Sequence, residues 1–139
     1  MEAMIAGVGI VFFLIILLGV ITVAVFYLLT LSNLLKEISD ENRQVPAVNV
    51  WLMFIPLFNL IYPFILYPKI CNSTKSEFES RKLDSDGDFG KGLGLAMAIL
   101  GIVGIIPVIG GIAGIAHLII FIVFWVKMAG YKNTLKSSK

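Results

Sequence analysis

Three long stretches of this sequence carry no charged side chain, and they constrain the fold more than any other feature. No Asp, Glu, Lys or Arg lies between Glu2 and Lys36, between Arg43 and Lys69, or between Lys91 and Lys127. A transmembrane helix needs about 20 mostly apolar residues, so the first two stretches are each long enough for one crossing and the third for two short ones. The sequence therefore predicts an integral membrane protein.

The composition supports this prediction and excludes several function classes. Hydrophobic residues make up 58% of the chain and charged residues 14%, whereas a soluble domain carries roughly 25% charged residues. The net charge is only +2, and no basic patch interleaved with aromatic residues lies outside the apolar stretches, so nucleic-acid binding is not expected. Cys71 is the single cysteine, which excludes an intrachain disulfide and a cysteine-based metal cluster.

The prediction is a single all-α transmembrane domain over residues 1–139 with four transmembrane helices. The crossings are expected at about residues 4–31, 48–70, 91–106 and 111–128, with polar loops at 32–47 and 71–90 and a basic C-terminal tail at 129–139. The third stretch is divided at Pro107 and Gly110-Gly111 into a tight hairpin of helices three and four. One straight helix of that length would reach about 50 Å, against a hydrocarbon core of about 30 Å. Glu77 and Arg81 stand four residues apart, so the second helix is expected to extend into water.

The lysine and arginine positions predict the orientation. With four crossings, one face carries Lys69, Lys75, Arg81, Lys82, Lys91, Lys127, Lys132, Lys136 and Lys139. The opposite face keeps Lys36 and Arg43, so the positive-inside rule places both termini in the cytoplasm. One alternative stays open. If segment 48–70 is re-entrant, every lysine and arginine falls on one side of the membrane and the N-terminus lies on the other.

The second apolar stretch reads WLMFIPLFNLIYPFILYPKI at 51–70 and includes three prolines and one asparagine. Pro56 and Pro63 each remove a backbone donor and free a carbonyl group that lipid cannot satisfy. The prediction is a kinked second helix in which Asn59 binds a neighbouring helix or the freed carbonyls. The alternative is a discontinuous helix that forms a binding site at the membrane midplane. His117, the only acidic or basic side chain within an apolar stretch, is expected to be neutral and hydrogen-bonded, and to meet Asn59 if both face inward.

Two local patterns resemble known groups of bacterial proteins. The pattern of Trp51, Pro56, Asn59, Leu60 and Pro63 resembles the second segment of a family of small four-helix membrane proteins of unknown function, although Trp51 lies farther from Pro56 than in that family. The stretch Glu41-Asn42-Arg43 and the ending W-V-K-M-A-G-Y-K at 125–132 are similar to a second, uncharacterised group. The resemblance implies a four-helix bundle in a bacterial inner membrane and implies no activity.

Small residues recur at helical spacing in the third and fourth segments. They are Gly90, Gly94, Ala98 and Gly101 in the third segment, and Gly110 and Gly114 at the start of the fourth. Small residues let membrane helices approach closely. This face is therefore expected to pack either within the hairpin or against another membrane subunit.

No catalytic, cofactor-binding or metal-binding pattern is recognised in the sequence. Asp84, Asp86 and Asp88 alternate as in a calcium loop, but the glycine and glutamate that complete such a loop are missing. The prediction is a non-enzymatic accessory or scaffolding subunit without a cofactor. Its expected partners are the lipid bilayer and a larger membrane protein or further copies of itself. The alternative is a small oligomeric channel or transporter with Asn59 and His117 lining the path.

Overall fold

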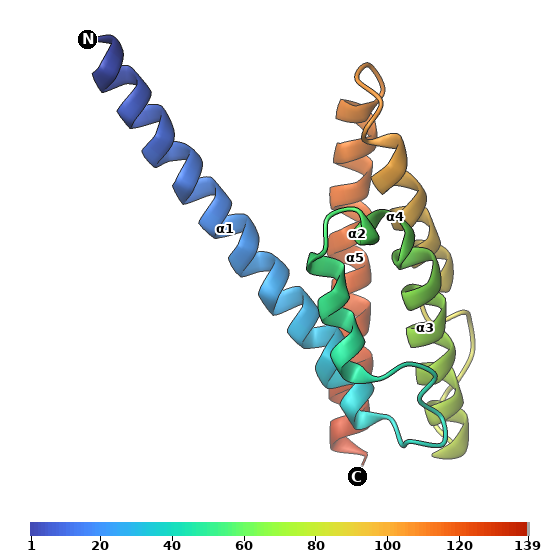
Figure 1. The fold of residues 1–139 in the computed structure, drawn as a ribbon. Helices are drawn as coiled ribbons and strands as arrows, with labels where there is room; N and C mark the ends of the chain where they lie inside the picture. Colours follow the sequence, from blue (N-terminus) through green and yellow to red (C-terminus); the bar gives the residue numbers. More distant parts are fainter. Residues whose placement is uncertain (139) are drawn as a thin grey trace.

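The computed structural model describes residues 1–138, and its regular elements are helices (Figure 1). They are α1 (Glu2–Glu37), the 3-10 helix η1 (Ala47–Phe54), α2 (Phe58–Ile61), α3 (Pro63–Ser80), α4 (Lys91–Val103) and α5 (Gly110–Ser137). No strand occurs within residues 1–138, so the all-α prediction is confirmed. Two of these helices, α1 and α5, are long and apolar enough to cross a membrane.

Helix α1 continues past its predicted end at residue 31 and stops at Glu37. Ile38 ends it with an extended backbone (φ −89°, ψ 133°). Arg43 then folds back, and its guanidinium donates to the carbonyl oxygens of Leu35 and Ile38, each at 2.7 Å. Carbonyl groups at the end of a helix have no partner within the helix. Arg43, part of the Glu41-Asn42-Arg43 stretch, therefore caps α1.

In place of the predicted single kinked helix over 48–70, the structure has three elements. η1 ends at Phe54, α2 is one short turn, and Pro63 is the first residue of α3. A proline fits the first turn of a helix, where its missing N–H is not needed. Pro56 lies in the turn between η1 and α2. The chain reverses direction here, and η1 and α3 run in opposite directions (Figure 1).

The C-terminal ends of α1, α3 and α5 meet at one end of the molecule (Figure 1). Arg81, which follows α3, donates to the carbonyl oxygen of Glu37 in α1 at 2.8 Å and to that of Leu135 in α5 at 2.7 Å. The N-terminus lies at the opposite end from the C-terminus (Figure 1). Helices α1 and α3 thus run toward the same end of the molecule.

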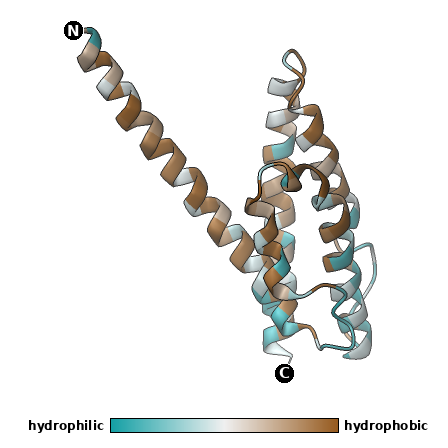
Figure 2. Cartoon of the chain, viewed as in Figure 1, coloured by the Kyte–Doolittle hydropathy of each residue, from teal (hydrophilic) through white to brown (hydrophobic). Residues whose placement is uncertain are grey.

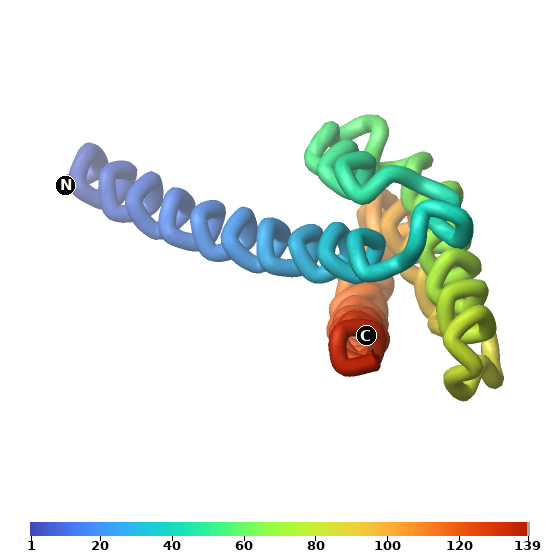
Figure 3. Tube along the Cα trace, turned by 90° about the horizontal axis from the view of Figure 1, so that it is seen from below, coloured from blue at the N-terminus to red at the C-terminus, as the bar shows by residue number. Residues whose placement is uncertain are grey.

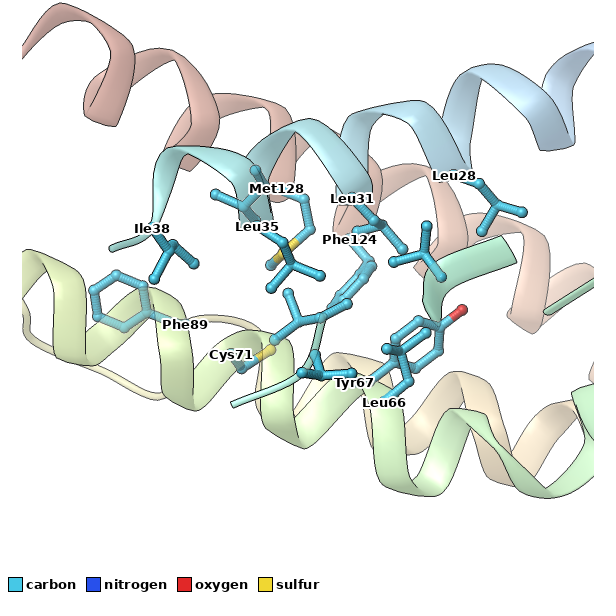
Figure 4. Packing of buried hydrophobic residues seen from close by; sticks show 14 of the residues in the cluster. Leu28, Leu31, Leu35, Ile38, Leu66, Tyr67, Cys71, Phe89, Phe124 and Met128 are labelled. Atoms are coloured by element: carbon cyan, nitrogen blue, oxygen red, sulfur yellow. The ribbon is translucent and has the colours of Figure 1, made fainter. Parts of the chain in front are cut away.

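The buried core is formed where the C-terminal part of α1 packs against α3 and α5 (Figure 4). Its fully buried side chains include Leu31, Leu34, Leu35, Ile38, Leu66, Ile70, Phe124, Met128 and Leu135. By contrast, residues 1–23, which include the first part of α1, are exposed. This half of α1 projects away from the other helices in two perpendicular views (Figures 1 and 3). Figure 2 shows that it is almost wholly apolar. The chain therefore leaves its most apolar helix largely unpacked.

Candidate functional site

A polar network around Glu77 joins the segment after α1 to α3. One carboxylate oxygen of Glu77 accepts hydrogen bonds from the backbone N–H of Ser39 (3.0 Å), the Ser39 hydroxyl (2.9 Å) and the Asn42 amide (3.1 Å). The other oxygen lies 3.3 Å from Nε of Arg81. The Glu77 side chain is only 5% exposed, and a carboxylate buried to that degree needs such partners to offset its lost hydration.

Arg81 uses its other nitrogens to join two further helices to this network. Its Nη1 donates to the Leu135 carbonyl and to the Ser138 hydroxyl at 2.8 Å, and its Nη2 donates to the Glu37 carbonyl. Carbonyl groups at helix C-termini carry partial negative charge, which a planar cation with several donors complements. The four-residue spacing of Glu77 and Arg81 was the only sequence signal for this cluster, and it did not show the contacts with α1 and α5.

The pKa of Glu77 links this network to pH. Burial raises the pKa of the carboxyl, but the bonds from Asn42 and Ser39 and the charge of Arg81 more than offset burial, so the pKa lies below its ordinary value of 4.5. A carboxyl group with a depressed pKa in the folded state stabilises the fold above its unfolded pKa. That contribution is lost as the pH falls through the folded pKa.

We therefore expect Glu77→Gln to lower the unfolding midpoint in detergent at about pH 7, with wild type and variant converging as the pH falls through the pKa of folded Glu77, which lies below 4.5. Thermal unfolding followed by circular dichroism across this pH range measures the difference. A gap between the two proteins that stays constant into acid would show that ionised Glu77 does not stabilise the fold.

A second cluster of contacts lies where α1 crosses α3 and α5. The Tyr27 hydroxyl donates to the Tyr67 hydroxyl at 2.9 Å, and the Trp125 indole N–H donates to the Thr30 hydroxyl at 3.0 Å. The ring of Tyr27 also packs on Phe121 and Trp125, with centroids 4.6 and 5.7 Å apart. Both tyrosines are buried. These contacts fix the inner end of the otherwise free α1.

We expect Tyr27→Phe and Tyr67→Phe each to cost about 1–2 kcal/mol in unfolding free energy, because each leaves the other buried hydroxyl without a partner. The double variant Y27F/Y67F removes both hydroxyls and is expected to cost no more than either single change. A double-mutant cycle measured by denaturant unfolding tests this coupling. Simple addition of the two single effects would contradict it.

The structure does not join Asn59 and His117. Asn59 lies in α2 and is exposed, whereas His117 lies half-buried in α5 and stacks on Phe121 with ring centroids 6.5 Å apart. Within residues 1–138, no hydrogen bond joins the two side chains. The predicted polar core of these two residues is therefore not formed inside one chain.

The six small residues of the predicted packing face fall into two groups. Gly90, Gly94 and Ala98 are buried, and a Cβ atom added to Gly94 would lie 2.8 Å from the Cβ of Tyr67. A Cβ atom on Gly110 would lie 2.5 Å from the Gly104 carbonyl oxygen, so this glycine allows the turn between α4 and α5. A Cβ atom added to Gly101 or Gly114 would meet no atom within 4 Å outside the backbone of its own helix. Most of this face thus packs within the chain.

The loop before α4 holds the three alternating aspartates. Asp88 accepts hydrogen bonds from the backbone N–H groups of Gly92 at 2.9 Å and Gly90 at 3.1 Å. These bonds, that of Gly92 above all, hold the pKa of Asp88 below its ordinary range. In this structure the Asp88 carboxylate therefore binds backbone N–H groups at the N-terminal end of α4. Lys139 of the predicted basic tail lies outside the described residues.

Comparison of this chain with protein-family models, curated proteins and solved structures gives no match. Within residues 1–138, no group of three or more His, Cys, Asp or Glu side chains is placed to hold a metal ion. The resemblance to small bacterial membrane proteins stays a prediction.

Proposed function

We propose that this protein is a non-catalytic integral membrane protein, and that it serves as an accessory or scaffolding subunit of a larger membrane complex. The observation that supports this proposal is the unpacked outer half of α1. Residues 1–23 are exposed along the whole helix surface, and they are charge-free after Glu2. Exposed apolar surfaces of this extent mark contacts with proteins or membranes. A helix held only at its inner end offers all its sides to a partner within the bilayer.

The proposed location is a bacterial inner membrane, with α1 and α5 as membrane-spanning helices. The basic end of the molecule, which holds the C-termini of α1, α3 and α5, then lies in the cytoplasm by the positive-inside rule. With α1 crossing the bilayer, the N-terminus lies outside. This orientation replaces the expectation of two cytoplasmic termini, because α1 and α3 run toward the same end.

Co-purification of the tagged protein from its native membrane in mild detergent tests the accessory role. A Cβ atom added to Gly7 or Gly19 of α1 would meet no atom within 4 Å outside the backbone of α1 itself, so leucine at either position leaves the internal packing unchanged. We expect a stoichiometric membrane partner to be retained by Lys82→Ala and lost with Gly7→Leu or Gly19→Leu. Partner-free, homogeneous protein would overturn the proposal.

A small oligomeric channel or transporter is the second candidate, and the exposure of Asn59 favours it. A polar side chain at membrane depth is costly unless it meets protein groups or water, and further copies of the chain would supply both. Ion flux into liposomes containing the purified protein tests this candidate, with Asn59→Leu and His117→Leu as variants. Flux that is lost in both variants would support it. A monomeric protein without flux would exclude it.

A further inference from the structure

Four helices are aligned by contacts in the core. The ring of Tyr67 in α3 packs on that of Phe124 in α5, with centroids 5.0 Å apart, and the backbone of Gly94 in α4 approaches the same tyrosine. Tyr27 of α1 donates its hydroxyl hydrogen to Tyr67. We call Tyr27, Tyr67, Gly94 and Phe124 the tyrosine layer. It is a common level from which the extent of each helix is counted.

Charge is divided sharply by the tyrosine layer. The ten described Lys and Arg residues all lie on the side of the layer that faces the basic end. The nearest of them on α3, α4 and α5 are Lys69, Lys91 and Lys127. Each of these three lies two or three residues from the layer. Beyond the layer in the other direction, Glu2 and His117 are the only acidic or basic residues among those that the structure describes. This division places a membrane surface near the layer on its basic side.

The helices extend by very different lengths beyond the tyrosine layer. At about 1.5 Å per residue, α1 extends about 38 Å from Tyr27 to Glu2, which is longer than the hydrocarbon thickness of about 30 Å and is accommodated by tilting. From Phe124 in the layer to Gly110, α5 extends about 21 Å, about two-thirds of the hydrocarbon thickness of about 30 Å. The segment from Tyr67 back to Phe58 extends only about 14 Å, or half of that thickness.

The segment of residues 47–62, which reaches about half-way across the hydrocarbon core, has features suited to lipid. Leu57, in the turn between η1 and α2, is 80% exposed, and residues 47–62 contain no charge. Pro56 has no N–H to satisfy, while the N–H groups of Ile55 and Asn59 donate to the carbonyls of Leu52 and Ile55 at 3.0 and 2.8 Å. The segment also contacts α1, α3 and α4. Lipid offers no partner to backbone polar groups, so bonds of this kind are required of a turn at membrane depth.

We infer that residues 47–62 form a re-entrant hairpin, which enters and leaves the bilayer from the basic side and ends among acyl chains near the midplane. This inference rests on the proposed membrane location. The hairpin carries Asn59 to the centre of the bilayer, beside α4, without a second crossing. The loop 38–46 and the loop 81–90 then lie on the same side of the membrane, as the bonds from Ser39 and Asn42 to Glu77 require.

Cysteine labelling with a membrane-impermeant maleimide tests the hairpin. The native Cys71 is fully buried, so the unaltered chain is the unlabelled control. Glu2, Glu41 and Lys82 are exposed and supply single-cysteine markers at the N-terminus and in the two loops. We expect Glu41→Cys and Lys82→Cys to react only in inside-out vesicles and Glu2→Cys only in right-side-out vesicles. Leu57→Cys is expected to stay unlabelled in both.

Two outcomes separate the hairpin from the membrane location itself. Reaction of Glu41→Cys and Lys82→Cys on opposite sides, or of Leu57→Cys on the side of Glu2→Cys, would overturn the hairpin and leave the membrane location intact. Release of the protein from membranes by alkaline carbonate would overturn the membrane location, and the hairpin with it.

Discussion

Replacing Arg81 with alanine is expected to destabilise the protein by about 3 kcal/mol. The substitution removes the partner of the buried Glu77 carboxylate. It also leaves the carbonyl groups of Glu37 and Leu135 without the donors that now bind them at 2.8 and 2.7 Å. The ends of α1, α3 and α5 thereby lose a side chain that bonds to all three.

Two further variants separate the geometry of Arg81 from its charge. Arg81→Lys keeps the charge but cannot donate in three directions from one plane, so it is expected to recover less than half of the loss. Lys82→Ala removes the adjacent, exposed cation and is expected to change the unfolding free energy by less than about 0.5 kcal/mol. Denaturant unfolding in detergent, followed by tryptophan fluorescence, measures all three. Equal effects of Arg81→Ala and Lys82→Ala would show that the network does not hold the helix ends together.

Substituting Gly94 with alanine is expected to cost about 2 kcal/mol, although alanine is the better helix former. The added Cβ would lie 2.8 Å from the Cβ of Tyr67 and 3.3 Å from Cε2 of Phe124. Both neighbours belong to the tyrosine layer, where Tyr67 also binds Tyr27, so a shift of α4 disturbs three other helices. Leucine at this position is expected to prevent folding.

Gly101 is the matched control because it lies in the same helix and the same predicted face, with no atom within 4 Å of an added Cβ. Gly101→Ala is expected to stabilise the protein by up to about 1 kcal/mol through helix propensity alone. The two glycine variants should therefore shift the unfolding midpoint in opposite directions. A stabilised Gly94→Ala protein would mean that α4 does not pack closely on Tyr67.

Several features of the fold follow from local sequence rules. The charge-free stretches predicted apolar helices at both ends of the chain, and α1 and α5 occupy them. Pro107 and the following glycines predicted the turn between α4 and α5, where Gly110 lies against the carbonyl group of Gly104. The four-residue spacing of Glu77 and Arg81 predicted a helix that continues past the apolar stretch, and α3 ends at Ser80. In each case the deciding interaction lies within a few residues along the chain.

The path of residues 47–62 and the partners at the candidate sites were decided only by the tertiary structure. An apolar run with prolines has the same hydropathy whether it kinks or reverses, so sequence alone could not separate a crossing from a hairpin. Arg81 bonds to residues 44 and 54 positions away, and Asn59 is exposed in α2 whereas His117 stacks on Phe121 in α5. Helix formation depends on neighbours in sequence. Which helix ends and faces meet depends on the packing of the whole chain.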